Sequence, residues 1–137
     1  MKLCSACLLG LKCRYDGKNK PNEKVINLAA KETLIPICPE QLGGFSTPRK
    51  PAEQKNGQVI TEDGDDVTIN FESGAKQVLA LAKLYDIRSA ILKQRSPSCG
   101  CGQIYDGTFS KTIIEGDGIT TKLLKENGIE VLTEDDI

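Results

Sequence analysis

The sequence predicts an α/β domain with a parallel or mostly parallel sheet flanked by helices. Two observations carry this prediction. Short apolar runs alternate along the chain with amphipathic, helix-like segments, and three of the runs end in turns rich in glycine, proline or serine. Alternating strands and helices are typical of a parallel sheet with right-handed crossovers. The 137 residues match the length of one ordinary domain, so we expect residues 1–137 to form a single domain.

The first half of the chain is expected to contain two strands and one short helix. The first apolar run covers residues 2–4 and leads into a polar loop over 8–21. A crossover helix is predicted over 22–31 and a second strand over 34–37. This strand contains a proline, which lacks the N–H group of a ladder hydrogen bond. Residues 38–66 read as a long loop, and loops of this length in compact domains usually carry function.

The second half is expected to contain two helices and two strands. Apolar residues recur at spacings of three and four over 67–85, which predicts an amphipathic helix. A strand over 89–93 follows, and then a hairpin or ordered loop over 103–109. A last helix is predicted over 119–127, because the next residue is a glycine at a typical left-handed cap position. It leads to a final strand over 129–132.

Charge and hydropathy exclude several classes of partner. The net charge of -1 provides no overall attraction toward nucleic acid or an anionic membrane. A local basic stretch over 12–24 is interpreted as a solvated loop face, with phosphate contact as the alternative. No apolar run is long enough to span a membrane, and the first residues do not resemble a signal peptide. We therefore expect a cytoplasmic protein with no membrane partner.

The cysteine and histidine content restricts the chemistry. The chain has six cysteines, and in a reducing compartment these are expected to be metal ligands, catalytic groups or small buried hydrophobes rather than disulfides. It has no histidine. Catalytic Ser-His-Asp or Cys-His arrangements and mixed Cys/His zinc sites are therefore excluded.

Three cysteines are expected to meet at one edge of the sheet. Cys7, Cys38 and Cys99 each lie shortly after a predicted strand. In Rossmann-like sheets, ligands bind in the crevice at the carboxyl ends of the strands. Three thiolates there would leave one iron of a cubane cluster open, and an open iron is a Lewis acid. A structural zinc site and inert buried cysteines are the alternatives, and the spacing does not decide between them.

The remaining cysteines have less defined predictions. Cys4 and Cys7 form a C-x-x-C motif, which by itself is compatible with redox, zinc or iron–sulfur chemistry. Alternation along the first strand makes Cys4 as consistent with a buried small residue as with a ligand. Cys13 and Cys101 lie close to the expected site in sequence, where each either takes part or fills space.

Acid–base groups lie next to the candidate ligands. Glu40 is two residues after Cys38, and Ser96 and Ser98 directly precede Cys99. Each would reach a substrate bound at an open metal position. The alternatives are a surface carboxylate for Glu40 and a hydroxyl that caps the local turn for Ser96.

Several short motifs, in order along nearly the whole chain, resemble one bacterial family. They are Ser5-Ala6-Cys7-Leu8-Leu9-Gly10, Arg14-Tyr15-Asp16-Gly17, Cys38-Pro39-Glu40, Thr47-Pro48-Arg49 with Ala52-Glu53, Asp66-Val67-Thr68 and Ser96-Pro97-Ser98-Cys99-Gly100. The family has long been labelled only as a domain of unknown function, and its characterised members are the thiouracil desulfidases (TudS). The chain resembles the short, single-domain form.

The resemblance implies a cofactor, a reaction and roles for particular residues. It implies a [4Fe-4S] cluster held by Cys7, Cys38 and Cys99, with one iron that the protein does not ligate. Glu40 and Ser96 would protonate a thiolated pyrimidine and assist attack by water, so that a thiocarbonyl becomes a carbonyl and sulfide leaves without a redox change.

The substrate class and its contacts follow as expectations. The resemblance implies a small thiolated pyrimidine base or nucleotide of the thiouracil or thiouridine type, and the charge does not favour thiolated tRNA. Six residues are candidate substrate contacts: Ser5, Arg14, Asp16, Arg49, Glu53 and Ser98. For the charged residues among them the alternative is a loop-fixing salt bridge. The alternative function is a structural or redox metal-binding module, with zinc or an iron–sulfur cluster and no catalysis.

Overall fold

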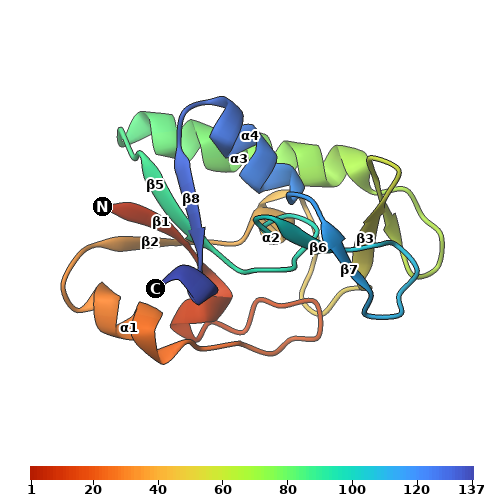
Figure 1. The fold of residues 1–137 in the computed structure, drawn as a ribbon, viewed down its shortest axis with the longest axis horizontal. Helices are drawn as coiled ribbons and strands as arrows, with labels where there is room; N and C mark the ends of the chain where they lie inside the picture. The colour runs from red at the N-terminus through yellow and green to blue at the C-terminus, as the bar shows by residue number, and fades with distance from the viewer.

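The computed structural model describes residues 1–137 and is built around a four-stranded parallel sheet in the order β2-β1-β5-β8 (Figure 1). The strands are β1 (Lys2–Ser5), β2 (Leu34–Ile37), β5 (Ser89–Leu92) and β8 (Glu130–Thr133). Each lies within one residue of its predicted position. The predicted α/β fold class with a parallel sheet is therefore confirmed.

The proline in the second strand is explained by the strand order. β2 pairs only with β1 and forms an edge of the sheet, with Pro36 opposite Cys4. An edge strand tolerates proline because one side of its backbone needs no ladder hydrogen bond.

Helices cover both faces of the sheet, as Figure 1 shows. They are α1 (Glu23–Ala29) on one face, and α3 (Thr68–Leu84) and α4 (Ile119–Glu126) on the other. Side chains along each strand alternate between the two cores. Leu3 and Ala90 pack in the core beneath α3 and α4, whereas Cys4 and Ile91 pack in the core on the side of α1.

The prediction of a long loop over residues 38–66 is wrong. This stretch contains a short helix and an antiparallel hairpin: α2 (Pro39–Leu42), β3 (Ala52–Lys55) and β4 (Gln58–Thr61). Asn56 and Gly57 form the hairpin turn with φ of 52° and 78°. Two successive residues with positive φ are the geometry of a two-residue hairpin turn, for which Asn-Gly is a favoured sequence.

A second hairpin lies beside the first. It pairs β6 (Gln103–Tyr105) with β7 (Ile113–Glu115), and the segment between them forms an ordered loop. The hairpin or ordered loop predicted over 103–109 therefore exists, but its second strand lies further along the chain. Two short 3-10 helices, η1 (Ala6–Leu9) and η2 (Glu134–Asp136), follow β1 and β8. None of the helices has the length and apolar character needed to cross a membrane.

A close backbone contact between α2 and α3 gives a stability prediction. Gly74 on α3 lies so near α2 that an added Cβ atom would overlap the carbonyl group of Pro39. We expect Gly74→Ala to lower the free energy of unfolding of the apoprotein by about 2–3 kcal/mol, because backbone must move to make room. Urea unfolding measures this effect. Lys76→Ala, an exposed change on the same helix, is the control, and equal stability of the two variants would contradict the prediction.

Candidate active site

A cavity of about 370 Å³ opens at the carboxyl ends of β1, β2 and β5. Its wall includes four of the six cysteines: Cys7, Cys13, Cys38 and Cys99. The three predicted to come together therefore do so, and Cys13 joins them. Glu40 and Ser96 also line the cavity. The ligands and the acid–base groups predicted from the sequence therefore share one space.

The strand order explains this convergence. Cys7 lies on η1 directly after β1, Cys38 directly follows β2, and Cys99 lies on the loop after β5. The chain continues from β1 to β2 on one side, whereas β5 lies on the other side of β1. Such a reversal of strand order leaves a crevice outside the carboxyl ends of the strands, because the connections diverge.

The loop that carries Cys99 is held by hydroxyl groups. The Ser96 Oγ accepts hydrogen bonds from the backbone N–H groups of Ser98 and Cys99, at 3.1 and 3.0 Å. From the other side, Thr121 on α4 donates its hydroxyl to the Cys99 carbonyl at 2.8 Å. Ser96 therefore caps the turn, as its alternative expected, and it also borders the cavity, where the predicted acid–base role would place it.

The thiols of Cys38 and Cys99 stay protonated when no metal is bound, because the pKa of each is raised. Desolvation raises the pKa of Cys99 to about 12, although contacts with the hydroxyls of Ser5 and Ser98 lower it. The pKa of Cys38 is also raised, chiefly by its hydrogen bond with the Cys13 thiol and then by burial. A metal takes cysteine as thiolate, so loading the site must release protons.

The arrangement of thiols fits a cluster better than a single ion. All four thiols border one cavity, but no three cysteine or carboxylate side chains meet at one ion-sized point. In a cubane each thiolate binds a different iron, so its ligands need not meet at one point. The donor set consists of sulfur alone, which suits iron–sulfur chemistry.

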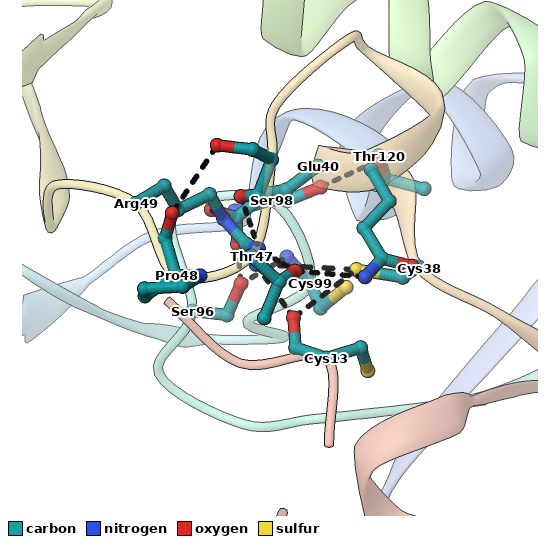
Figure 2. Close-up of polar contacts among 12 residues, drawn as sticks. Cys13, Cys38, Glu40, Thr47, Pro48, Arg49, Ser96, Ser98, Cys99 and Thr120 are labelled. Carbon is teal, nitrogen blue, oxygen red and sulfur yellow. Dashed lines mark hydrogen bonds and ion pairs between the residues drawn. The ribbon is translucent and has the colours of Figure 1, made fainter. Parts of the chain in front are cut away.

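A buried ion pair links the carboxylate to the thiols (Figure 2). The Arg49 Nε donates to Glu40 Oε1 at 3.1 Å, and these side chains are 6% and 18% exposed. The same guanidinium donates through Nη2 to the Cys13 carbonyl at 2.9 Å and through Nη1 to the Thr47 hydroxyl at 3.0 Å. Nη2 also lies 4.0 Å from the Cys38 Sγ. Arg49 thus fixes the position of the carboxylate and places positive charge beside the thiols.

Comparison with known proteins identifies the family. Residues 3–136 match the 2-thiouracil desulfurase family. The chain belongs to this family. A relative, the uncharacterized protein YbbK of Bacillus subtilis (strain 168), is 44% identical over 147 residues, covering 100% of this chain and 97% of its own length.

A solved structure in the same family has the same fold. It is the [4Fe-4S]-dependent thiouracil desulfidase TudS (DUF523Vcz), which superposes with a TM-score of 0.94 at 45% identity. The match covers 99% of this chain and 91% of that one. The family expected from the sequence motifs is therefore confirmed.

The predicted substrate contacts of this family member divide into two groups. Four of them line the cavity: Ser5, Arg14, Arg49 and Glu53. The other two do not. Ser98 is 1% exposed and bonds through its hydroxyl to Thr120 at 2.8 Å, behind the cavity wall. Asp16 is exposed, accepts from its own loop at Lys18 and lies 3.6 Å from the guanidinium of Arg14.

Two of the cavity residues also hold the wall together. The Ser5 hydroxyl accepts from the backbone N–H of Lys93 at 2.9 Å and so connects β1 to the end of β5. Glu53 Oε1 accepts from the backbone N–H groups of Gly107 and Phe109, at 3.0 and 3.1 Å. The Glu53 carboxylate therefore fixes the loop between β6 and β7. It does so through hydrogen bonds to backbone N–H groups, whereas the alternative expected from the sequence was a salt bridge.

The two cysteines outside the cavity have structural partners. Cys4 is fully buried on β1, its thiol donates to the Ser5 carbonyl at 3.6 Å, and burial raises its pKa to about 12. The thiol of Cys101 donates to the Val131 carbonyl at 3.7 Å. Neither thiol borders the space between the candidate ligands.

The structure adds cavity residues that sequence reasoning missed. They are Tyr15, Tyr105, Phe109 and Lys111, with Arg95 at the same wall. Tyr105, Phe109 and Lys111 belong to the second hairpin and its loop, and their position beside the first hairpin depends on tertiary packing. Only Tyr15 had a signal in the sequence, because it is an aromatic residue directly after Arg14 in a loop expected near the site.

Proposed function

We propose that this member of the 2-thiouracil desulfurase family is a [4Fe-4S]-dependent, non-redox desulfidase. Its substrate is a thiolated pyrimidine of the thiouracil or thiouridine type. The reaction breaks the carbon–sulfur bond, forms a carbon–oxygen bond from water and releases hydrogen sulfide. No electron enters or leaves, because water replaces sulfide at the same oxidation level.

Cys7, Cys38 and Cys99 are the proposed cluster ligands. They come from three neighbouring strand ends and border one cavity. When bound, the cluster would supply a Lewis-acidic iron without a protein ligand, which suits the soft sulfur of the substrate. The Glu40–Arg49 ion pair lines the same cavity as these thiols.

Glu40 and Ser96 are the proposed acid–base residues. The Glu40 carboxylate is held by Arg49 at the cavity wall, where it is positioned to take a proton from the attacking water. The Ser96 oxygen already accepts two backbone N–H groups, so its own proton is the part free to point elsewhere. The two backbone N–H groups withdraw electron density from the Ser96 oxygen, which makes the Ser96 hydroxyl a better proton donor to the pyrimidine ring.

Cavity size supports a small substrate. The space of about 370 Å³ must hold the cluster as well as the substrate, which suits a small pyrimidine, whereas a folded RNA would need an extended basic surface. The observation that carries the proposal is the joint presence of the thiols and the paired carboxylate in this one cavity, in a chain 45% identical to a [4Fe-4S]-dependent thiouracil desulfidase.

The proposal predicts the metal content and the reaction. Protein purified and reconstituted without oxygen should contain about four irons and four sulfides per chain, absorb broadly near 400 nm, and release sulfide from 2-thiouracil or 4-thiouridine. Metal analysis, the visible spectrum and a sulfide assay measure these properties. Stoichiometric zinc that persists after attempted reconstitution would contradict the proposal and favour a structural module.

Removing each proposed ligand should reduce iron loading. We expect Cys7→Ala, Cys38→Ala and Cys99→Ala each to lose most of the cluster, because each removes one of the three proposed thiolate ligands. Cys4→Ala is the matched control, since its thiol lies in the same core cluster as Cys7 but does not border the cavity. Full iron loading in any of the three ligand variants would remove that residue from the proposed set.

A further inference from the structure

Gln94 lines the cavity, but the proposed function gives it no role. It lies two residues after β5, at the start of the turn that carries Ser96 and Cys99 (Figure 2). Gln94 is only 7% exposed, although glutamine is mostly found at protein surfaces. A buried amide needs hydrogen-bond partners, so the partners of Gln94 indicate what it does.

The side chain of Gln94 joins the two ends of this turn. Its Oε1 accepts from the backbone N–H groups of Arg95 and Cys101, at 3.2 and 2.7 Å. Its Nε2 donates to the Cys101 carbonyl at 2.8 Å. The amide therefore pairs with the backbone of Cys101 through one donor and one acceptor. Ser96 and Cys99 lie between the two residues that the amide joins.

The backbone at Arg95 needs support of this kind. Arg95 has a φ of 66°, in the left-handed region that few residues other than glycine occupy. Strained backbone persists only where the surrounding structure holds it, and it is concentrated at functional sites. Because Arg95 directly precedes Ser96, its backbone sets the direction in which the chain enters the turn. If Arg95 relaxed to ordinary backbone, the Ser96 hydroxyl would move.

The short helix η2 holds Gln94 from another side. Glu134 Oε1 accepts from the Gln94 backbone N–H at 2.6 Å, and Glu134 Oε2 lies 3.0 Å from the Lys93 ammonium. The Glu134 side chain is 10% exposed, so solvent screens these contacts little. Lys93 also donates to the Gln94 carbonyl at 2.9 Å. Both backbone polar groups of Gln94 and both ends of its side-chain amide thus have protein partners.

We infer that Gln94 is a positioning residue of the active site, which holds Ser96 and Cys99 in place, and that Glu134 anchors it. This inference rests on the proposed function, which gives Ser96 and Cys99 their roles. Glu134 does not line the cavity. The placement of the acid–base hydroxyl therefore depends on a carboxylate that never meets the substrate.

Kinetics of the reconstituted protein test the inference. A displacement of about 1 Å at a reacting group can cost about 100-fold in rate, so we expect Gln94→Met to lower kcat per four-iron cluster by about 10- to 100-fold. KM for 2-thiouracil should change little, because the displaced hydroxyl acts in the reaction step. Gln58→Met makes the same exchange at an exposed position of β4 outside the cavity and should match wild type.

Two further variants test the connection to Glu134 and the use of the amide. Glu134→Met should also lower kcat, and the double variant with Gln94→Met should be no slower than the slower single variant, because both residues act on one turn. Gln94→Glu keeps the acceptor for the Cys101 N–H but loses the donor, so its kcat should lie between those of wild type and Gln94→Met. These two variants carry the test if Gln94→Met does not fold.

Amide hydrogen exchange, resolved to single residues by fragmentation mass spectrometry, gives a readout independent of turnover. The Cys101 N–H loses its acceptor in Gln94→Met, so its exchange accelerates in any case. The Cys99 N–H is informative because its acceptor is the Ser96 Oγ rather than Gln94. We expect its exchange to accelerate by about 10-fold or more in Gln94→Met and Glu134→Met, but not in Gln58→Met.

The two readouts together decide the inference. Wild-type exchange at Cys99 in Gln94→Met would overturn it, since the turn would then hold without the amide. Faster exchange at Cys99 with wild-type kcat would also overturn it, since the movement would not matter for the reaction. If wild type itself releases no sulfide from 2-thiouracil or 4-thiouridine, the proposed function falls, and exchange at Cys99 still decides whether Gln94 holds the turn.

Discussion

Glu40→Gln should slow sulfide release by about 100-fold or more while leaving the iron content unchanged. The carboxylate lines the cavity and is held by Arg49 at 3.1 Å, but it is not among the proposed cluster ligands. An amide of the same shape cannot accept a proton from water. General acid–base groups typically contribute a factor of 10² to 10⁴, so we expect the turnover number to fall by about 100-fold or more.

The measurement compares sulfide release and iron per chain in the same preparation. Glu62→Gln is the matched control, since Glu62 also borders the cavity but is exposed at its mouth. This control should retain the activity of wild type. Loss of iron from Glu40→Gln would instead assign the carboxylate a structural role at the site, and full activity would remove it from the mechanism.

Local patterns made most of the sheet and the long helices predictable. The 17 residues of α3 repeat apolar side chains with a helical period, and the four strands of the main sheet are short apolar runs that end in turns. These signals lie within single segments, so they do not depend on tertiary contacts. The same reasoning placed Cys7, Cys38 and Cys99 together, because parallel strands have their carboxyl ends at one edge.

The hairpin of β3 and β4 was missed because β3 is polar and β4 has only one short apolar pair, Val59-Ile60. β3 reads Ala-Glu-Gln-Lys, with no apolar alternation, although the Asn56-Gly57 pair is a hairpin signal. Glu53 is 9% exposed in this strand because its carboxylate accepts from Gly107 and Phe109, more than 50 residues further along the chain. No local pattern reports such a contact.

The position of Cys13 illustrates the same limit at the site. In the sequence it cannot be distinguished from Cys4 or Cys101, since all three lie near a candidate ligand. In the structure its carbonyl is held by Arg49, a residue 36 positions away. A contact between two loops thus decides which of the three extra thiols faces the cavity.

Arg49→Met should destabilise the apoprotein and disturb the site together. The guanidinium is 6% exposed and has partners in Glu40, Thr47 and Cys13. Methionine fills similar space but leaves the carboxylate without its cation. Removing one partner of a buried ion pair strongly destabilises a protein, so we expect the free energy of unfolding to fall by about 3 kcal/mol. Urea unfolding of the apoprotein measures the change, and Lys50→Met is the control.

The control differs from Arg49 in burial rather than in charge. Lys50 is adjacent in sequence and forms an ion pair with Asp63, but both side chains are largely exposed. Exposed pairs contribute little because water screens them, so Lys50→Met should unfold as wild type does. Equal destabilisation by the two substitutions would show that loss of positive charge, rather than loss of the buried contacts, is responsible.

A double variant identifies the cause of the destabilisation at Arg49. If the unpaired carboxylate is responsible, adding Glu40→Gln to Arg49→Met should recover part of the lost stability, because the buried group no longer carries a charge. Arg49→Lys should fall between wild type and Arg49→Met, since it keeps the charge but lacks the planar fork that reaches three partners at once. If the double variant is less stable than Arg49→Met alone, the destabilisation comes from the lost contacts to Thr47 and Cys13, and Arg49 acts mainly by bridging the loops that carry the carboxylate and the fourth thiol.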